Sequence, residues 1–258
     1  LIESVNELQS YPKYTPTSVI GHKKAKKLEP HINFKGNENI IFSKADGAID
    51  PKDAISKMID VIKKNGGSVL YPCKFERIIE SNDSFSKVKT SMGILKSENV
   101  IFCNGVDVDN SFNVNFLKKP RPGVIIKTKP QKNLINSVVY GPKIHAHQQS
   151  NGQIIIGEQI TAPIKKNTKD HIKRINKHFK SMVKGGTDLN PSEVLIGWRP
   201  IPKDDLPIIG KFKNKSVYIA VMHSGISLAA IVGNLVTQEI VDEVDSLLLK
   251  DFRPSRFF

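Results

Sequence analysis

Apolar residues recur at helical spacing after Asp50, and this stretch predicts the clearest helix of the chain. Asp50 is a favoured N-cap, and Pro51 is a favoured first helical residue. The apolar positions that follow are Ala54, Ile55, Met58, Ile59 and Ile62. Because Gly66 and Gly67 favour the end of a helix, we expect the helix to stop there.

Short apolar runs separated by turn residues follow this helix and predict strands. We expect strands over residues 68–71, 75–80, 86–90 and 99–103, with turns at 82–84 and 92–93. Four further runs between residues 120 and 160 read GVIIKTKP, NSVVYG, KIHAHQQ and GQIIIGEQI. Their lengths and turn signals predict antiparallel strands.

Three more segments carry helix or strand signals. Residues 168–182 predict a polar helix with Ile172, Ile175 and Phe179 on its apolar face. The run VYIAVM predicts a short buried strand, and GISLAAIVGNLVTQEIVDEV predicts a helix after it. Since the first half of this helix is apolar on all of its faces, we expect that half to be buried. Gly233 in its middle predicts close packing against a neighbouring element. The opening LIESVNELQS predicts an amphipathic helix.

Composition is that of a soluble globular protein. The chain has 258 residues with 39% hydrophobic and 25% charged residues, which suits one large domain or two intertwined ones. No apolar run approaches the ~20 residues of a membrane-spanning helix. The first residue is Leu1 and no signal-peptide pattern follows it, so we expect a cytoplasmic chain cut in mid-protein.

Cysteines and charge narrow the classes of function. The chain has only two cysteines, Cys73 and Cys103, which argues against a disulfide framework. Neither has a second Cys or a His at metal-ligand spacing, which argues against a metal site. Cys103 lies in the apolar run NVIFCNG and is expected to be a small buried residue. The net charge is +14, but the lysines are scattered and not interleaved with aromatics. This pattern favours a solvated surface over a nucleic-acid site.

One loop does not have the pattern of a scaffold element. Residues 197–210 read GWRPIPKDDLPIIG, and three prolines in this span exclude a helix. This stretch, the later VYIAVMHSGISLAAIVGNLV and the closing DFRPSRF resemble the C-terminal third of the FAD-dependent D-amino-acid oxidase family, which includes glycine oxidase, sarcosine oxidase and amino-acid dehydrogenases. DGAIDP, NGGSVLYPCKFERI, ENVIFCNG and NGQIIIGE match family blocks in the same order.

The resemblance implies an α/β (α+β) fold and covers nearly the whole chain. The chain would be the C-terminal part of a two-domain FAD oxidoreductase, with half of a Rossmann-like FAD layer interleaved with a mostly antiparallel substrate-binding sheet. The substrate domain would hold residues 1–45 and 116–195, and the FAD domain residues 46–115 and 196–258. The family opens with a Gly-x-Gly-x-x-Gly turn that binds the FAD pyrophosphate. No glycines here form that pattern, so we expect about a hundred residues to be missing.

The resemblance also implies that Arg199, in the Gly-x-Arg-Pro motif that starts at Gly197, binds the substrate carboxylate. A guanidinium suits this task because it is planar, always charged and bidentate. The loop by itself favours a structural ion pair of Arg199 with Asp204 or Asp205, and only the resemblance reverses this preference. We expect these two carboxylates to point to opposite sides and to fix the loop, one of them through backbone N–H groups.

A second predicted site surrounds His223. A helix that starts at Ser224 or Gly225 presents backbone amides and a positive dipole end. The resemblance implies that Ser224, Gly225, Ile226 and Ser227 face the flavin edge where negative charge develops on reduction. It places His223 near the substrate, although a lone histidine also fits a packed or solvated position.

Several other positions complete the predicted site. His145 and His147 alternate along a predicted strand, and two histidines without a third ligand do not predict a metal site. His145 falls near an active-site tyrosine of glycine-oxidase-like members, so lining the substrate pocket is the implied role. Asn104 and Gly105 end a strand that passes FAD in the family, although a plain turn fits equally well. Gly197 and Gly210 are likewise implied to lie near the cofactor.

The implied function is oxidation of the C–N bond of a small amino acid or N-alkyl amino acid by hydride transfer to FAD. Oxygen or an electron carrier would then accept the electrons. Three alternatives stay open: a non-catalytic fragment or partner subunit without its own FAD cradle, a nucleic-acid-binding protein suggested only by the charge, and a tRNA-modifying member of the same fold.

Overall fold

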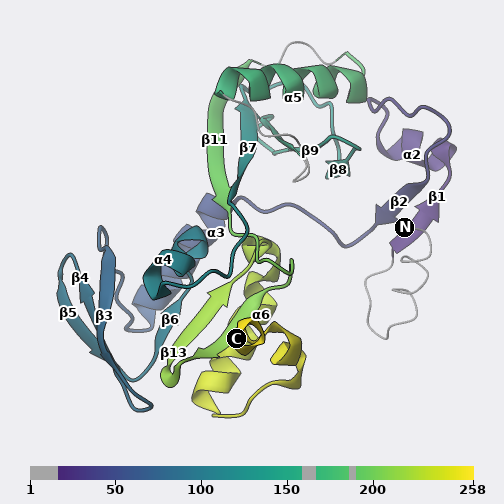
Figure 1. Ribbon diagram of the computed structural model, residues 1–258. Helices are drawn as coiled ribbons and strands as arrows, with labels where there is room; N and C mark the ends of the chain where they lie inside the picture. Colours follow the sequence, from purple (N-terminus) through teal and green to yellow (C-terminus); the bar gives the residue numbers. More distant parts are fainter. Residues whose placement is uncertain (1–16, 159–166, 186–189) are drawn as a thin grey trace. The chain divides into compact units, whose positions relative to one another are not determined.

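The computed structural model describes residues 17–158, 167–185 and 190–258. The chain divides into two compact units, one of residues 1–49 and 122–197 and the other of residues 50–121 and 198–258 (Figure 1). Each unit is therefore built from two separate stretches of sequence. The helix expected in residues 1–10 lies outside the described residues.

The first unit contains a five-stranded sheet in the order β11-β7-β10-β9-β8. Its strands are β7 (Arg121–Thr128), β8 (Val139–Tyr140), β9 (Ile144–Gln148), β10 (Ile154–Glu158) and β11 (Pro191–Arg199). Strand β10 pairs antiparallel with both β7 and β9, and β8 pairs antiparallel with β9. The antiparallel strands expected between residues 120 and 160 are confirmed. A separate antiparallel pair, β1 (Thr17–Ile20) and β2 (Ile40–Ser43), flanks the short helix α2 (His22–Leu28).

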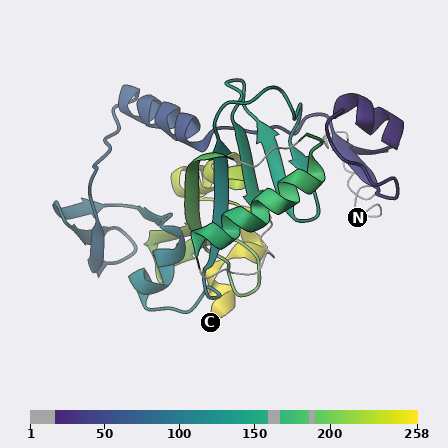
Figure 2. The same cartoon turned by 90° about the horizontal axis from the view of Figure 1, so that it is seen from above.

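Helix α5 (Thr168–Met182) lies across one face of this sheet (Figure 2). The Asn167 side chain caps its first turn by accepting a hydrogen bond from the Asp170 amide. Ile175 and Phe179 are buried against the alternate residues of the strands, as the helical spacing predicted. Because only the inward face is apolar, the helix can cover the sheet and keep its lysines in water.

A buried ion cluster also joins α5 to the sheet. Glu158 ends β10, and its carboxylate binds Nδ1 of His171 at 2.7 Å and the guanidinium of Arg174. Burial alone would raise the pKa of Glu158, but hydrogen bonds from Arg174 and His171 outweigh it and lower that pKa. The charge of the carboxylate is thus compensated inside the unit.

The second unit contains two three-stranded sheets. One is the antiparallel meander β3 (Phe75–Ser81), β4 (Ser86–Thr90) and β5 (Gly93–Ser97). The other has the order β12-β13-β6 and consists of β12 (Ile208–Phe212), β13 (Asn214–Val221) and β6 (Val100–Phe102). Strand β12 is antiparallel to β13, whereas β6 is parallel to it. The helices are α3 (Pro51–Lys64), α4 (Val108–Phe112) and α6 (Gly225–Val241), with the 3₁₀ turns η1 (Gly105–Asp107), η2 (Leu247–Phe252) and η3 (Pro254–Phe257).

The helix predicted after Asp50 is confirmed. The Asp50 carboxylate accepts hydrogen bonds from the amides of Lys52 and Asp53, and Pro51 is the first residue of α3. The strand predicted over residues 68–71 is wrong, since those residues have no strand pairing. Strand β5 was not predicted, because a turn signal after β4 does not reveal that the chain reverses and pairs again.

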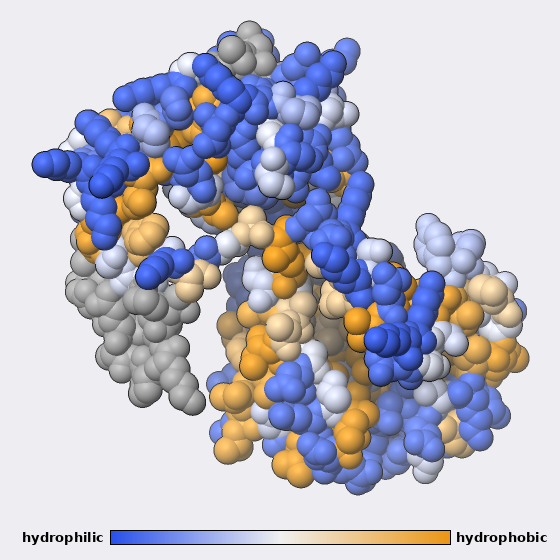
Figure 3. Space-filling model, turned by 180° about the vertical axis from the view of Figure 1, so that it is seen from behind, coloured by the Kyte–Doolittle hydropathy of each residue, from blue (hydrophilic) through white to orange (hydrophobic). Residues whose placement is uncertain are grey.

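Three predictions about burial and packing are also wrong. The first half of α6 is exposed, with Ile226 at 52% and Ile231 at 48%, and a Cβ on Gly233 would meet no atom within 4 Å. Only the side of α6 facing the sheet is covered within this unit, so apolar residues on its other sides remain at the surface, as do others in the orange regions of Figure 3. Cys103 is exposed because the chain leaves the sheet directly after β6.

The C-terminal tail is fixed to α6 by a buried carboxylate. Glu239 accepts hydrogen bonds from Arg253 at 2.8 and 2.5 Å, from the Tyr218 hydroxyl at 2.5 Å and from the Ser246 amide at 2.6 Å. Its side chain is fully buried. Four donors thus converge on one carboxylate and join β13, α6 and the tail. Among the helices that the structure describes, none has the length and apolar content to cross a bilayer.

Candidate active site

The parallel pairing of β6 and β13 determines where the site lies. Val100 pairs with Val217 and Phe102 with Ile219, so both strands end at the same edge of the sheet. The segment 103–105 follows β6 and the segment 222–225 follows β13. Ligands of open α/β sheets bind outside the carboxyl ends of parallel strands, which makes this edge the first place to look for a site.

Arg199 lies at the same edge. It is the last residue of β11, and the next residue, Pro200, lies so close to Gly105 that a Cβ built there would be 3.7 Å from the proline Cγ. Its positive charge also acts on His223. The structure therefore brings Arg199, His223 and Gly105 together in the second unit, although they are far apart in sequence.

Two effects favour the neutral form of His223. Burial lowers the pKa of the imidazole below its ordinary value, and the guanidinium of Arg199 lowers it further. Its Nδ1 lies 3.2 Å from the Ser224 hydroxyl oxygen. Because both effects disfavour the imidazolium, the ring of His223 is uncharged at pH 7.

Helix α6 begins at Gly225, one of the two starts that the sequence predicted, and Ser224 is the other. Ser224 is its N-cap but makes no side-chain capping bond, and its carbonyl accepts from the Leu228 amide at 3.0 Å. Helix geometry directs the amides of Gly225, Ile226 and Ser227 outward, without partners inside the helix. This end of α6 therefore favours negative charge next to His223.

Asn104 and Gly105 form the turn that follows β6. The Asn104 amide donates to the Ser111 hydroxyl at 2.8 Å, and Gly105 has a φ of +58° at the start of η1. A glycine accommodates this left-handed conformation without strain. The geometry gives both residues a role in the turn, and their contact with a cofactor stays a prediction.

The other two glycines differ in their surroundings. Gly210 lies in β12 with a φ of +148°, and a Cβ there would be 3.0 Å from Arg253 Cδ and 3.1 Å from Pro254 Cδ. The close approach of the C-terminal tail is thus a sufficient reason for glycine at this position. Gly197 lies in β11 beside open space, since a Cβ there would meet no atom within 4 Å. Cofactor contact by either glycine remains a prediction.

His145 belongs to the first unit, where it lies flat between two neighbours. Its ring stacks on Tyr140 of β8 with a centroid distance of 5.3 Å and an angle of 25°. On the adjacent strand it covers Gly157, where a Cβ would be 2.4 Å from Cε1 and Nε2 of the ring. Tyr140 is 71% exposed. The sequence did not predict its contact with His145, because the contact depends on the pairing register of β8 and β9.

Gly157→Ala should displace His145. The added methyl group would overlap the imidazole, so the ring has to leave its position, and we expect a loss of about 1–3 kcal/mol in the free energy of unfolding. Urea denaturation measures this loss, and the NMR shifts of the His145 ring report its displacement.

The matched control for this substitution is the double variant Gly157→Ala/His145→Ala. Removal of the imidazole makes room for the methyl group, so the second substitution should restore most of the stability relative to His145→Ala alone. Equal destabilisation by Gly157→Ala in both backgrounds would contradict the packing of His145 on Gly157.

Asp204 and Asp205 make contacts that stabilise the loop after Arg199. Asp204 accepts from the Leu206 amide at 3.1 Å and binds Arg256, whereas Asp205 binds Lys118 at 2.6 Å. The expectation that one of them fixes the loop through a backbone N–H is confirmed. Their divergence comes from a turn at Asp205, whose φ is +66°, and not from an extended loop. The role of Arg256 was missed, although DFRPSRF was recognised as part of the pattern.

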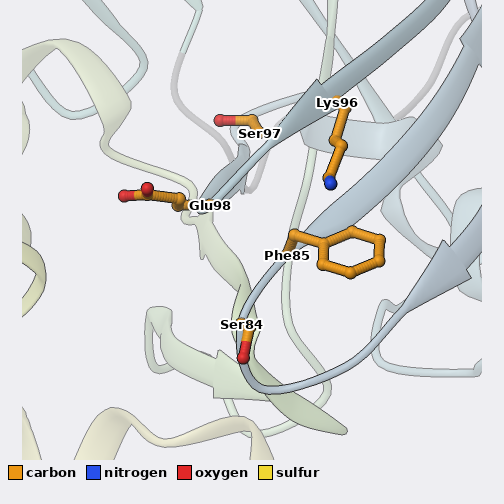
Figure 4. A pocket seen from close by; sticks show the side chains of 5 residues that line it. All are labelled: Ser84, Phe85, Lys96, Ser97 and Glu98. Atoms are coloured by element: carbon orange, nitrogen blue, oxygen red, sulfur yellow. The ribbon is translucent and has the colours of Figure 1, made fainter.

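Two shallow cavities contain none of the predicted site residues. One, of about 340 Å³, is lined by Ser84, Phe85, Lys96, Ser97 and Glu98 (Figure 4). Lys96 Nζ lies 4.2 Å from the centre of the Phe85 ring, so the two side chains of this cavity already contact each other. The other, of about 380 Å³, surrounds Gln148, whose amide is bound to the backbone on both its oxygen and its nitrogen. Within the described residues, no group of three potential ligands could hold a metal ion.

The family profile described as "FAD dependent oxidoreductase" matches residues 3–239. Among curated proteins, the bifunctional protein ThiO/ThiG of Trichormus variabilis is 24% identical over 190 residues, which are 70% of this chain and 29% of that protein. The chain therefore spans less than a third of this relative.

Several solved structures of similar fold are of enzymes whose names include an amino acid. L-proline dehydrogenase from P. horikoshii has a TM-score of 0.81 and 22% identity, over 94% of this chain and 69% of that one. Glycine oxidase from Geobacillus kaustophilus has a TM-score of 0.79 and 16% identity, over 94% and 68%. L-amino acid deaminase from Proteus myxofaciens has a TM-score of 0.82 and 13% identity, over 100% and 71%. At these identities the likeness shows a common fold.

Proposed function

Because this chain belongs to the family of FAD-dependent oxidoreductases, we propose that it oxidises the C–N bond of a small amino acid or N-alkyl amino acid. The observation that carries the proposal is the convergence of Arg199, His223 and the first turn of α6 at the carboxyl edge of β6 and β13. A cation, an imidazole whose neutral form is favoured and outward-facing amides at one edge suit a substrate that has a carboxylate and an amine. The amino-acid names of the similar structures support the same substrate class.

Each group has a distinct proposed role. Arg199 donates two parallel hydrogen bonds to the substrate carboxylate and so fixes the orientation of its Cα–H bond. His223, neutral beside Arg199, accepts a hydrogen bond from the substrate amine, which reacts in its unprotonated form with its lone pair available to form the imine. FAD supplies the hydride acceptor when it is bound.

The residues present fit one side of an FAD site. The amides of Gly225, Ile226 and Ser227 would face the flavin edge that becomes negative, and the turn at Asn104 and Gly105 would approach the cofactor from β6. The pyrophosphate-binding glycine motif does not occur in these 258 residues. We further propose that the imine is hydrolysed by water and that oxygen or an electron carrier takes the electrons.

The test is anaerobic bleaching of the flavin in the FAD-loaded protein. We expect small amino acids to bleach it, and the matching amino amides, which lack the carboxylate charge, to do so at least about tenfold more slowly. Asp205→Asn, which alters an exposed carboxylate of the same loop, is the control and should behave like the unaltered protein. A protein that stays colourless with added FAD would favour the non-catalytic partner, and one that is yellow but not bleached by any amino acid would favour another substrate, such as a tRNA base.

A further inference from the structure

The loop after Arg199 has few backbone hydrogen bonds to hold it. Residues 200, 202 and 207 are prolines and have no N–H to donate. On one side the loop pairs with the segment 116–118: the Lys118 amide donates to the Ile201 carbonyl at 2.8 Å, and the Lys203 amide to the Phe116 carbonyl at 2.9 Å. Beyond residue 203 the loop turns back. The Asp205 amide donates to the Pro202 carbonyl at 3.0 Å, and side chains make the other contacts of the tip.

Two cations hold this tip: Lys118 binds Asp205, and Arg256 binds Asp204. The Nε of Arg256 donates to Asp204 Oδ2 at 2.5 Å and its Nη2 to Oδ1 at 3.0 Å, which is a bidentate contact. Nη2 also donates to the Leu206 carbonyl at 3.0 Å, and Nη1 to the Arg253 carbonyl at 3.0 Å. All three nitrogens are therefore in use, and the guanidinium joins the C-terminal tail to both sides of the turn.

The contact is more protected than a surface ion pair. The side chain of Arg256 is 19% exposed and that of Asp204 is 34% exposed, whereas Lys118 and Asp205 of the neighbouring pair are 43% and 69% exposed. The hydrogen bonds from Arg256 lower the pKa of Asp204, so the carboxylate is ionised throughout the neutral range. A bidentate guanidinium contact fixes the orientation of the Asp204 carboxylate as well as its distance from Arg256. A single contact from a lysine ammonium does not fix the orientation.

The tail that carries Arg256 is itself anchored. Arg253 binds the buried carboxylate of Glu239 in α6, the helix whose other end carries Gly225. The chain of contacts thus runs from α6 through Glu239, Arg253 and Arg256 to the loop that follows Arg199. The two sides of the candidate active site are joined through the C-terminal tail.

We propose that Arg256 is a positioning residue that, through Asp204, fixes the loop after Arg199 and so sets the direction in which Arg199 meets the substrate carboxylate. This inference rests on the proposed function, because it requires Arg199 to bind a carboxylate. Arg256 acts only through Asp204 and the loop. Its loss should therefore affect recognition of the carboxylate specifically and leave the reaction of a substrate analogue without the carboxylate nearly unchanged.

The test compares Arg256→Lys and Asp204→Asn with the control Asp205→Asn in the FAD-loaded full chain. For each protein, kcat and KM are measured with a small amino acid and with its amide. We expect the two test variants to lower kcat/KM for the amino acid about tenfold and for the amide less than about twofold, since misplacement of a binding group affects only the substrate that uses it. Asp205→Asn should leave both values within about twofold, because its ion pair is exposed.

Two further readouts separate positioning from stability alone. Hydrogen exchange of residues 200–207, measured with and without FAD, should be faster in Arg256→Lys and unchanged in Asp205→Asn. Added to Arg199→Lys, the Arg256 substitution should produce no further loss of selectivity for the carboxylate, because both act on one contact. A general loss of structure would instead lower kcat/KM equally for the amino acid and for its amide.

The outcomes also distinguish this inference from the proposed function. If Arg199→Lys removes the preference for the carboxylate but Arg256→Lys and Asp204→Asn keep it, the positioning role is wrong and the function stands. If Arg199→Lys itself keeps the preference, the carboxylate assignment is wrong and the positioning role falls with it. Unchanged exchange in residues 200–207 would overturn the inference whatever the kinetics show.

Discussion

Arg199→Lys should reduce kcat/KM for an amino-acid substrate by about 30- to 1000-fold, which corresponds to a loss of about 2–4 kcal/mol of transition-state stabilisation. The positive charge remains, but an ammonium cannot make the two parallel hydrogen bonds that fix a carboxylate. The substrate would then sample orientations in which its Cα–H bond is misdirected. Steady-state kinetics over a range of substrate concentrations measure the effect.

FAD binding should survive this substitution, since the residues proposed to face the cofactor are elsewhere, in the first turn of α6 and after β6. Flavin absorbance of the purified variant checks this point. The matched control is Lys203→Gln, which removes an exposed cation four residues further along the same loop and should change kcat/KM by less than about twofold. An unchanged kcat/KM in Arg199→Lys would exclude Arg199 as the carboxylate-binding residue.

Arg253→Ala should be the most destabilising single substitution that these contacts suggest, with a loss of about 3–5 kcal/mol in the free energy of unfolding. It leaves the carboxylate of Glu239 buried without its guanidinium partner. The Tyr218 hydroxyl and the Ser246 amide remain as donors, but neither carries a compensating charge. Urea denaturation monitored by circular dichroism measures the loss.

Two variants test the cause of this destabilisation. Lys211→Ala removes an ion pair to Asp245, whose side chain is 69% exposed, and should change stability by less than about 1 kcal/mol. Arg253→Ala combined with Glu239→Gln removes the unpaired charge and should recover part of the loss. If the double variant is no more stable than Arg253→Ala, the penalty does not come from the buried carboxylate.

The same carboxylate predicts a dependence of stability on pH. Burial alone would raise the pKa of Glu239, but hydrogen bonds from Arg253, Tyr218 and Ser246 lower it from 4.5 to about 2. Because the pKa is lower in the folded state, the contribution is complete above pH 4.5 and is lost as the pH falls toward 2. The slope of unfolding free energy against pH in this window should therefore be smaller in Arg253→Ala.

Local sequence signals determined the elements that depend on few residues. Asp50 and Pro51 specified the start of α3, and the spacing of Ile172, Ile175 and Phe179 specified α5 together with its buried face. Caps and apolar periodicity act within one or two turns of helix, so they can be read before the fold is known. The strand VYIAVM and the start of α6 at Gly225 could be predicted for the same reason.

Predictions that required knowledge of the surroundings were less accurate. The exposure of Ile226, Ile231 and Gly233 in α6 depends on what the rest of the unit covers, and the apolar pattern alone does not contain that information. Strand β5 was missed because a turn residue does not reveal whether the chain beyond it pairs again. Burial and pairing are properties of the assembled unit.

By itself, the sequence determined the family through its ordered blocks, the segment 197–210 as a candidate site, and Arg199 as its central cation. Only the tertiary structure decided that Arg199 acts on His223 and that Arg256, near the other end of the unit's sequence, holds Asp204. The reason is physical: a bidentate ion pair or a shift in the pKa of a histidine depends on separations of a few ångströms between residues that are dozens of positions apart. Those separations exist only after β6, β13 and the C-terminal tail have packed together.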